Sequence, residues 1–261
     1  MTESPEPTAA PAAPLAPSHA RIGWEVAIVL ALGLGQSAVY SVVQLLDLLT
    51  RPAPLGDQST TLNPSVSPRE WLDLTYQLLD NAFAVAPVLL ACWLVWSVAR
   101  PHLGRLGMAW DRPWRDFGWS WVLVLAVGVP GIGVYLAGRA LGVTVAVDPT
   151  GLGAHWYTIP VLLLSAARSG IQEEVVMIGY LFDRLRAAKW NDWWIIVGSA
   201  AVRGTYHLYQ GFGAWVGNFA MGLLFGWIYR RWGRLLPLVF AHALIDAIIF
   251  VGYPFVAPYL P

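Results

Sequence analysis

Five ionisable residues, carried by three separate apolar stretches, could together activate a water molecule or bind a metal ion. They are Glu173, Glu174, His207, His242 and Asp246. Glutamate and histidine commonly transfer protons in catalysis, and imidazole combined with carboxylate is a ligand set that suits zinc. Asp246 follows His242 by four positions, so on a helix its carboxylate could orient the imidazole. The residue types therefore predict either an acid–base cluster that activates water or a metal site built from nitrogen and oxygen ligands.

The acidic pair is the costliest part of this set. Glu173 and Glu174 lie in a stretch, residues 165–186, that is otherwise apolar enough to sit in a bilayer. One charge at the centre of a membrane helix costs roughly 2.5–3.5 kcal/mol on insertion scales. The pair therefore needs a cavity, a proton, a cation or a metal ion. In a soluble protein such a pair would usually be solvated helix surface, and a single membrane-buried histidine most often joins two helices.

Composition indicates the class of protein that must position these residues. Hydrophobic residues make up 57% of the 261 residues, charged residues make up 12%, and there are 15 tryptophans. Soluble proteins average about 25% charged residues, so we expect an all-α, multi-pass transmembrane bundle. A formal net charge of zero leaves no basic face for nucleic acid. The single cysteine, Cys92, excludes an intramolecular disulfide and a cysteine-rich metal site.

We expect seven apolar stretches to cross the bilayer, whose core needs about 20 helical residues. The expected spans are 22–46, 72–99, 117–141, 156–182, 193–209, 214–229 and 235–255. A further helix within residues 47–78 would make eight spans. Residues 1–20 are rich in Pro and Ala and carry no apolar run, so we expect a disordered tail there.

The distribution of arginine predicts the orientation of the bundle. Four arginines fall within 100–116, whereas 143–155 carries neither Lys nor Arg. Because basic loops favour the cytoplasm, we expect the N-terminus inside and the C-terminus outside, with only Arg51 and Arg69 as outer exceptions. At about 1.5 Å of rise per residue, the glutamate pair and the two histidines then fall within about 5 Å of the midplane of a core about 30 Å thick.

Three motifs resemble those of a known family. The chain reads EE at 173–174 with GYL at 179–181, then TYHLYQG at 205–211, then HALID at 242–246. In order and spacing these motifs are similar to those of the CAAX-protease and bacteriocin-processing family of intramembrane proteases, also called the abortive-infection family. The resemblance covers about residues 165–250. It implies a catalytic transmembrane core at 156–256, and hydropathy alone predicts the N-terminal transmembrane helices at 21–155.

The resemblance implies endopeptidase activity and a role for each motif residue. Glu173, with His207, would activate the water that attacks the scissile carbonyl, while Glu174 completes the acidic motif. His242 and Asp246 would stabilise the oxyanion or complete a metal site. From the imidazole and carboxylate ligand types we expect that metal to be zinc, with Glu173, His207 and His242 as its ligands. The implied substrate is a membrane-associated protein or peptide, of which CAAX-type or lipidated proteins are one class.

Two positions depart from the family pattern. The acidic motif usually ends in Arg, four residues after its second glutamate, where this chain has Ile178. Arg203, four residues before His207, is our candidate for the missing cation, and Arg168 is a second candidate unless it extends to the outer interface. The family often has Asn where this chain has Asp246. An ionised carboxylate cannot donate a hydrogen bond, so Asp246 is expected to orient His242 or to bind metal.

Two other functions fit the same residues. A non-catalytic scaffold, immunity or regulatory protein of the same fold would account for the loss of the motif arginine. A transporter could use the buried carboxylates for coupling, although no inverted repeat supports this. The leading interpretation is a multi-pass integral metalloprotease of a bacterial plasma membrane that acts in intramembrane proteolysis or CAAX-box protein maturation, with lipid and a membrane-associated substrate as its partners.

Overall fold

The computed structural model describes residues 17–96 and 102–256. Of the tail expected at 1–20, residues 1–16 lie outside the described residues, and the first helix begins at His19, where the Ser18 side chain accepts a hydrogen bond from Arg21 N. The expected second span ends at residue 99, so its last three residues also lie outside the described part. The described chain is mostly helical, as composition predicts.

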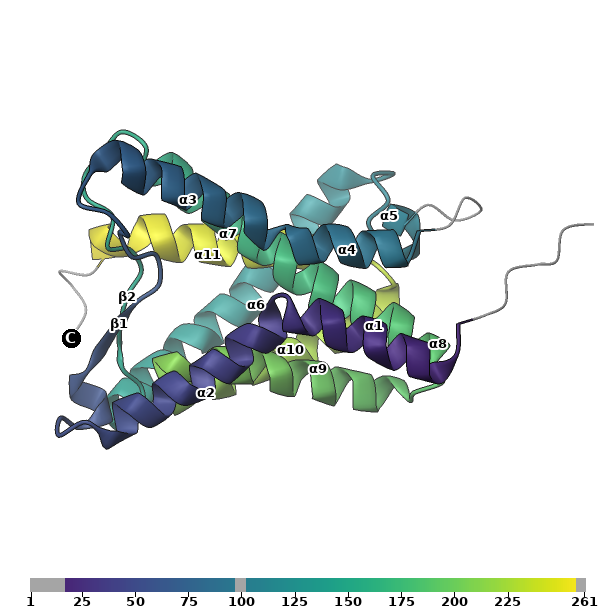
Figure 1. The fold of residues 1–261 in the computed structure, drawn as a ribbon, viewed down its shortest axis with the longest axis horizontal. Helices are drawn as coiled ribbons and strands as arrows, with labels where there is room; N and C mark the ends of the chain where they lie inside the picture. The colour runs from purple at the N-terminus through teal and green to yellow at the C-terminus, as the bar shows by residue number, and fades with distance from the viewer. Residues whose placement is uncertain (1–16, 97–101, 257–261) are drawn as a thin grey trace, which may run out of the picture.

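Eleven α-helices in the described residues form a bundle (Figure 1). They are α1 (His19–Ala31), α2 (Leu34–Thr50), α3 (Glu70–Ala84), α4 (Ala86–Leu94), α5 (His102–Arg105), α6 (Pro113–Ala140), α7 (Thr158–Glu173), α8 (Leu181–Ala187), α9 (Asp192–Tyr206), α10 (Phe212–Trp232) and α11 (Leu236–Val256). A π-helix, Glu174–Tyr180, joins α7 to α8, and short 3-10 turns lie at Leu55–Asp57 and Leu208–Gln210.

Several of these helices are long and apolar enough to span a membrane, and the chain is an integral membrane protein. Within the described residues, four stretches have the necessary length and hydropathy, namely 70–94, 113–140, 212–232 and 236–253. The pair α1 and α2 makes a fifth if counted as one span bent by 55°. Neither α9, which has 15 residues, nor the segment that carries the glutamate pair is among them. Seven spans and a cytoplasmic N-terminus therefore stay predictions.

Glycines bring the helices that carry the motif residues close together. A Cβ atom on Gly170 of α7 would lie 2.8 Å from Ala243 N and 2.9 Å from Val239 O of α11. A Cβ atom on Gly222 of α10 would lie 2.8 Å from Ala200 Cα of α9. Small residues permit this close approach of helix backbones. The chain thereby places α7 against α11, and α9 against α10, at the depth of the candidate site.

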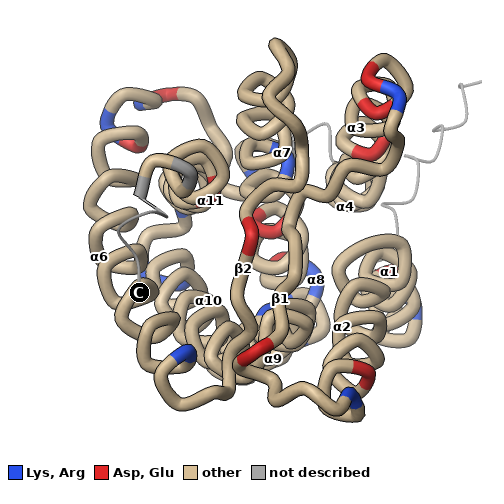
Figure 2. The backbone as a smooth tube through the Cα atoms, turned by 90° about the vertical axis from the view of Figure 1, so that its left-hand side faces the viewer, with Lys and Arg blue, Asp and Glu red and all other residues tan. Residues whose placement is uncertain are grey.

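A small parallel sheet, absent from the all-α prediction, closes one end of the bundle. Strand β1 (Ser59–Thr61) pairs with β2 (Ala146–Asp148), with Ser59 opposite Ala146 and Thr61 opposite Asp148. Figure 2 views this end and shows the two strands crossing the middle of the surrounding helices. Both strands belong to loops that we expect on the outer side of the membrane, and the structure brings these loops together.

Three arginines, Arg105 of α5 and Arg184 and Arg186 of α8, lie in the helices that Figure 1 places at the opposite end. The Arg105 side chain forms hydrogen bonds to Asp183 at 2.5 and 3.0 Å. Arg234, in the turn between α10 and α11, donates to Asp111 at 2.6 Å and holds the pKa of that carboxyl below its usual range. The grouping agrees with the arginine pattern of the sequence, in which the basic loops share one side.

Candidate active site

The two motif glutamates lie where the helix changes its hydrogen-bonding pattern. Glu173 is the last residue of α7, and Glu174 opens the π-helix. Single π-turns inside α-helices occur frequently at functional sites. Both glutamates are buried. The expected partners come from two other helices: Arg203 lies on α9, His207 caps its C-terminal end, and His242 lies on α11.

The Glu174 carboxylate contacts one arginine and one histidine. Its Oε1 atom accepts a hydrogen bond from Arg203 Nη2 at 2.7 Å and lies 2.7 Å from His242 Nδ1. The Arg203 side chain is fully buried, and so is that of Glu174. Burial strengthens such an interaction but makes it costly to leave either partner alone. Glu174 therefore connects α7, α9 and α11 and fixes the orientation of the His242 ring.

Glu173 lies beside the same arginine and also beside one tyrosine and two histidines. Its Oε2 atom accepts a hydrogen bond from Tyr206 Oη at 2.6 Å and lies 3.5 Å from Arg203 Nη1. The same oxygen is 3.9 Å from His207 Nε2 and 3.9 Å from His242 Nε2. These last two distances exceed a direct hydrogen bond, so neither histidine nitrogen is bonded directly to Glu173.

Asp246 completes the ring of polar atoms. Its Oδ2 atom lies 3.8 Å from His242 Nε2, one turn along α11. His207 Nε2 is buried and makes no hydrogen bond among the described residues, while His207 Nδ1 lies 3.3 Å from Gln210 Nε2. The structure therefore brings all five predicted residues together, and it leaves an imidazole nitrogen free to hold a water beside Glu173.

Arg203 contacts the two glutamates, as we expected of the residue that replaces the missing motif arginine. Ile178, at the position of the motif arginine, is completely buried among apolar side chains. The Arg203 guanidinium instead contacts both glutamates, and its stem passes Gly222, on which a Cβ atom would lie 3.3 Å from Arg203 Cδ. Arg168, the second candidate, donates to Gln172 Oε1 at 3.2 Å and contacts neither glutamate through an ion pair.

Tyr206 is a site residue that the sequence analysis missed. It is three residues after Arg203 and therefore lies on the same side of α9, and it precedes His207 directly. Its hydroxyl gives Glu173 the shortest hydrogen bond of the cluster. The signal was its spacing from Arg203, because a residue one helical turn from a buried cation faces the same neighbours.

The candidate ligand atoms lie farther apart than zinc ligands do, and the zinc ion that we expected stays a prediction. Within the described residues, no three His, Cys, Asp or Glu side chains are placed to hold a metal ion. Ligand atoms of a tetrahedral zinc with bonds of about 2.0–2.1 Å lie about 3.4 Å apart, whereas Glu173 Oε2 is 3.9 Å from each histidine nitrogen. Arg203 already supplies a positive charge to both glutamates, so no step below passes through a metal.

Comparison with known proteins identifies one family. The family model described as type II CAAX prenyl endopeptidase Rce1-like matches residues 155–248. No curated protein and no solved structure matches the chain. The matched segment contains all three motifs and every residue of the cluster. Residues 155–248 are thus similar to the Rce1-like CAAX prenyl endopeptidases, which confirms the resemblance to intramembrane proteases drawn from the motifs.

Proposed function

We propose that the protein is an intramembrane endopeptidase that hydrolyses peptide bonds of membrane-associated proteins or peptides. The observation that carries the proposal is the position of Glu173 Oε2, which faces two imidazole nitrogens at 3.9 Å while Tyr206 and Arg203 hold its carboxylate. Carboxylate and imidazole around one water form a general-base arrangement. The family match supports a protease, and CAAX-type or lipidated proteins are one candidate substrate class.

In the proposed reaction, water lies between Glu173 Oε2 and His207 Nε2. Glu173 takes its proton as the oxygen attacks the scissile carbonyl, and the proton then passes to the leaving amine. His242 donates to the oxyanion from Nε2 when its ring is protonated, because its Nδ1 atom is directed at Glu174. Asp246, 3.8 Å from His242 Nε2, helps to orient that ring. As an ionised carboxylate it does not donate to the oxyanion itself.

Replacement of Glu173 tests the proposal. The purified protein should cleave members of a library of peptides and lipidated proteins, and Glu173→Gln should lower kcat by about 10²-fold or more, since it removes the base. Glu70→Gln, at a half-exposed carboxylate at the start of α3, is the matched control and should leave cleavage unchanged. Binding of a library member without cleavage by the wild type would instead select the non-catalytic scaffold, and solute flux in liposomes would select the transporter.

A chelator separates this mechanism from a zinc enzyme. Because Arg203 already neutralises the glutamates and the mechanism proposed uses no metal, treatment with 1,10-phenanthroline should leave cleavage within about twofold of the untreated rate, and metal analysis should find less than stoichiometric zinc. Loss of activity that stoichiometric zinc restores would contradict this expectation and would favour Glu173, His207 and His242 as ligands.

A further inference from the structure

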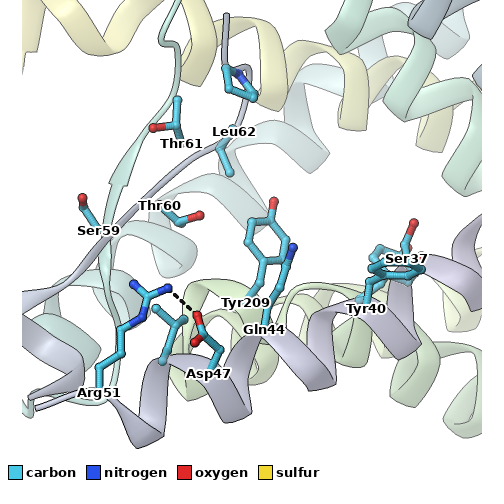
Figure 3. Close-up of a pocket in the computed structure, with 13 residues that line it drawn as sticks. Ser37, Tyr40, Gln44, Asp47, Arg51, Ser59, Thr60, Thr61, Leu62 and Tyr209 are labelled. Atoms are coloured by element: carbon cyan, nitrogen blue, oxygen red, sulfur yellow. Dashed lines mark hydrogen bonds and ion pairs between the residues drawn. The ribbon is translucent and has the colours of Figure 1, made fainter. Parts of the chain in front are cut away.

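A cavity of about 510 Å³ lies between β1 and α2, within the range of about 300–1,000 Å³ that is common for ligand sites. One wall is formed by Ser59, Thr60 and Thr61 of β1, and the other by polar residues of α2 that include Gln44 and Asp47. Figure 3 shows Tyr209 between these two walls. The cavity is therefore lined by a strand on one side and a helix on the other.

The strand presents a free edge. Gln58 O accepts from Ala146 N at 2.8 Å, and Leu62 N donates to Asp148 O at 2.9 Å. Because a carbonyl and the next N–H point to opposite sides of a strand, the Ser59 N–H and the Thr61 C=O point away from β2. Among the described residues, β2 is the only strand paired with β1. Such an edge is a template for another extended chain.

The edge is held firmly beside α2. Gln58, which is buried, donates from Nε2 to Leu48 O at 2.8 Å and to Ala53 O at 2.9 Å. Arg51, also on the cavity wall, lies 3.4 Å from Gln58 Oε1 and pairs with Asp47. These contacts fix the spacing between the strand and the helix, so an incoming segment would meet an ordered edge.

The cavity reaches the candidate active site. Tyr206 lines it together with Tyr209, and the Tyr206 hydroxyl donates to Glu173 Oε2 at 2.6 Å. Tyr209 N is fixed by the Ser41 side chain of α2 at 2.7 Å. One tyrosine therefore contacts both the cavity and the proposed general base, so Glu173 lies directly behind a side chain of the cavity wall.

We propose that the free edge of β1 binds the substrate as an added strand. Backbone hydrogen bonds to Ser59 and Thr61 hold an extended segment in the cavity between β1 and α2, and the scissile bond lies beyond Tyr206 at Glu173. Backbone pairing of this kind gives affinity largely without regard to side chains. The inference rests on the proposed peptidase function and adds the site that holds the substrate.

The first test removes one edge donor. Ser59→Pro lacks the N–H, and proline is tolerated at the first residue of an edge strand; Gln58, with φ −97° and ψ 162°, already has a conformation suited to a following proline. With a peptide cleaved in the library assay, Ser59→Pro should raise KM about 3- to 10-fold with kcat within twofold. Ser59→Ala keeps the N–H and should match the wild type.

The second test uses the wild-type protein and so does not depend on the folding of a variant. The same peptide is methylated on one backbone nitrogen at a time. Strand addition predicts that KM rises at alternate residues on one side of the scissile bond, because successive N–H groups point to opposite edges. Equal KM values for Ser59→Pro and Ser59→Ala, or losses without alternation, would overturn the added strand.

Failure of the strand proposal is distinguishable from failure of the peptidase. If Glu173→Gln abolishes cleavage but the methylation pattern does not alternate, the peptidase stands and only the substrate site is wrong. If Glu173→Gln cleaves as fast as the wild type, or no library member is cleaved at all, the proposed function fails, and the strand proposal falls with it.

Discussion

The interior around the glutamate pair and the outer face of α6 use glycine in opposite ways. In α7 and α10, Gly170 and Gly222 stand where an added methyl would meet a neighbouring backbone at 2.8 Å. In α6, a Cβ atom on Gly118, Gly128 or Gly131 would meet nothing within 4 Å. The helices with motif residues therefore pack backbone against backbone around buried charge. The outer face of α6 instead presents apolar surface to its surroundings.

The largest effect should follow from removal of the buried cation. Arg203→Met leaves two buried carboxylates without their partner, and loss of one member of a buried pair costs about 3–5 kcal/mol. We expect it to abolish cleavage and to lower the thermal stability of the detergent-purified protein. Arg203→Lys keeps the charge but not the two-pronged contact, and should retain part of both properties. Wild-type stability and activity in Arg203→Met would show that the charge cluster does not hold these helices.

An intermediate effect on stability should distinguish glycines at close helix contacts from glycines on the outer face of α6. Gly170→Ala places its methyl 2.8 Å from Ala243 N and should destabilise the protein by about 1–3 kcal/mol. Gly118→Ala in α6 has open space and should be neutral or stabilising by up to about 1 kcal/mol, because alanine favours the helix. Thermal unfolding in detergent measures both. Equal effects of the two substitutions would mean that α7 and α11 can separate freely.

The smallest effect should come from Tyr206→Phe, which keeps the ring and removes one hydrogen bond to Glu173. A hydrogen bond to a charged group is worth about 1.5–3 kcal/mol, and part of this is recovered because Arg203 also contacts the carboxylate. We expect kcat to fall about 3- to 10-fold, with stability within 1 kcal/mol of the wild type. Tyr180→Phe, which changes a buried hydroxyl that makes no hydrogen bond among the described residues, is the control.

The residue types in the sequence were enough to predict that the five ionisable residues of the cluster lie together, because few ionisable groups can be buried in lipid without a polar partner. The contact between Arg203 and the glutamates was also predictable, since the missing arginine at Ile178 required a replacement. Tyr206 was missed because its hydroxyl is uncharged, and the sequence analysis looked for residues whose charge needs a partner in the membrane. The expected zinc was inferred from ligand types alone and stays a prediction, because Glu173 Oε2 lies 3.9 Å from each histidine nitrogen, farther than the spacing of zinc ligands.

The fold was predictable where hydropathy is continuous and not where structure depends on distant pairing. The apolar stretches became helices, and the composition was sufficient for that. Strands β1 and β2 have three residues each and lie more than 80 positions apart, so no local pattern could indicate them. The π-helix at Glu174 and the bend between α1 and α2 likewise leave no periodic signal.

The end of the bundle that carries β1 has a consequence for the origin of the substrate. The strand and its cavity lie opposite the arginine-rich end (Figure 1). If that basic end faces the cytoplasm, as the sequence predicts, the strand edge opens to the extracytoplasmic space. A substrate segment on that side of the membrane would then reach the strand edge directly, and a cytosolic prenylated protein would have to approach by another route.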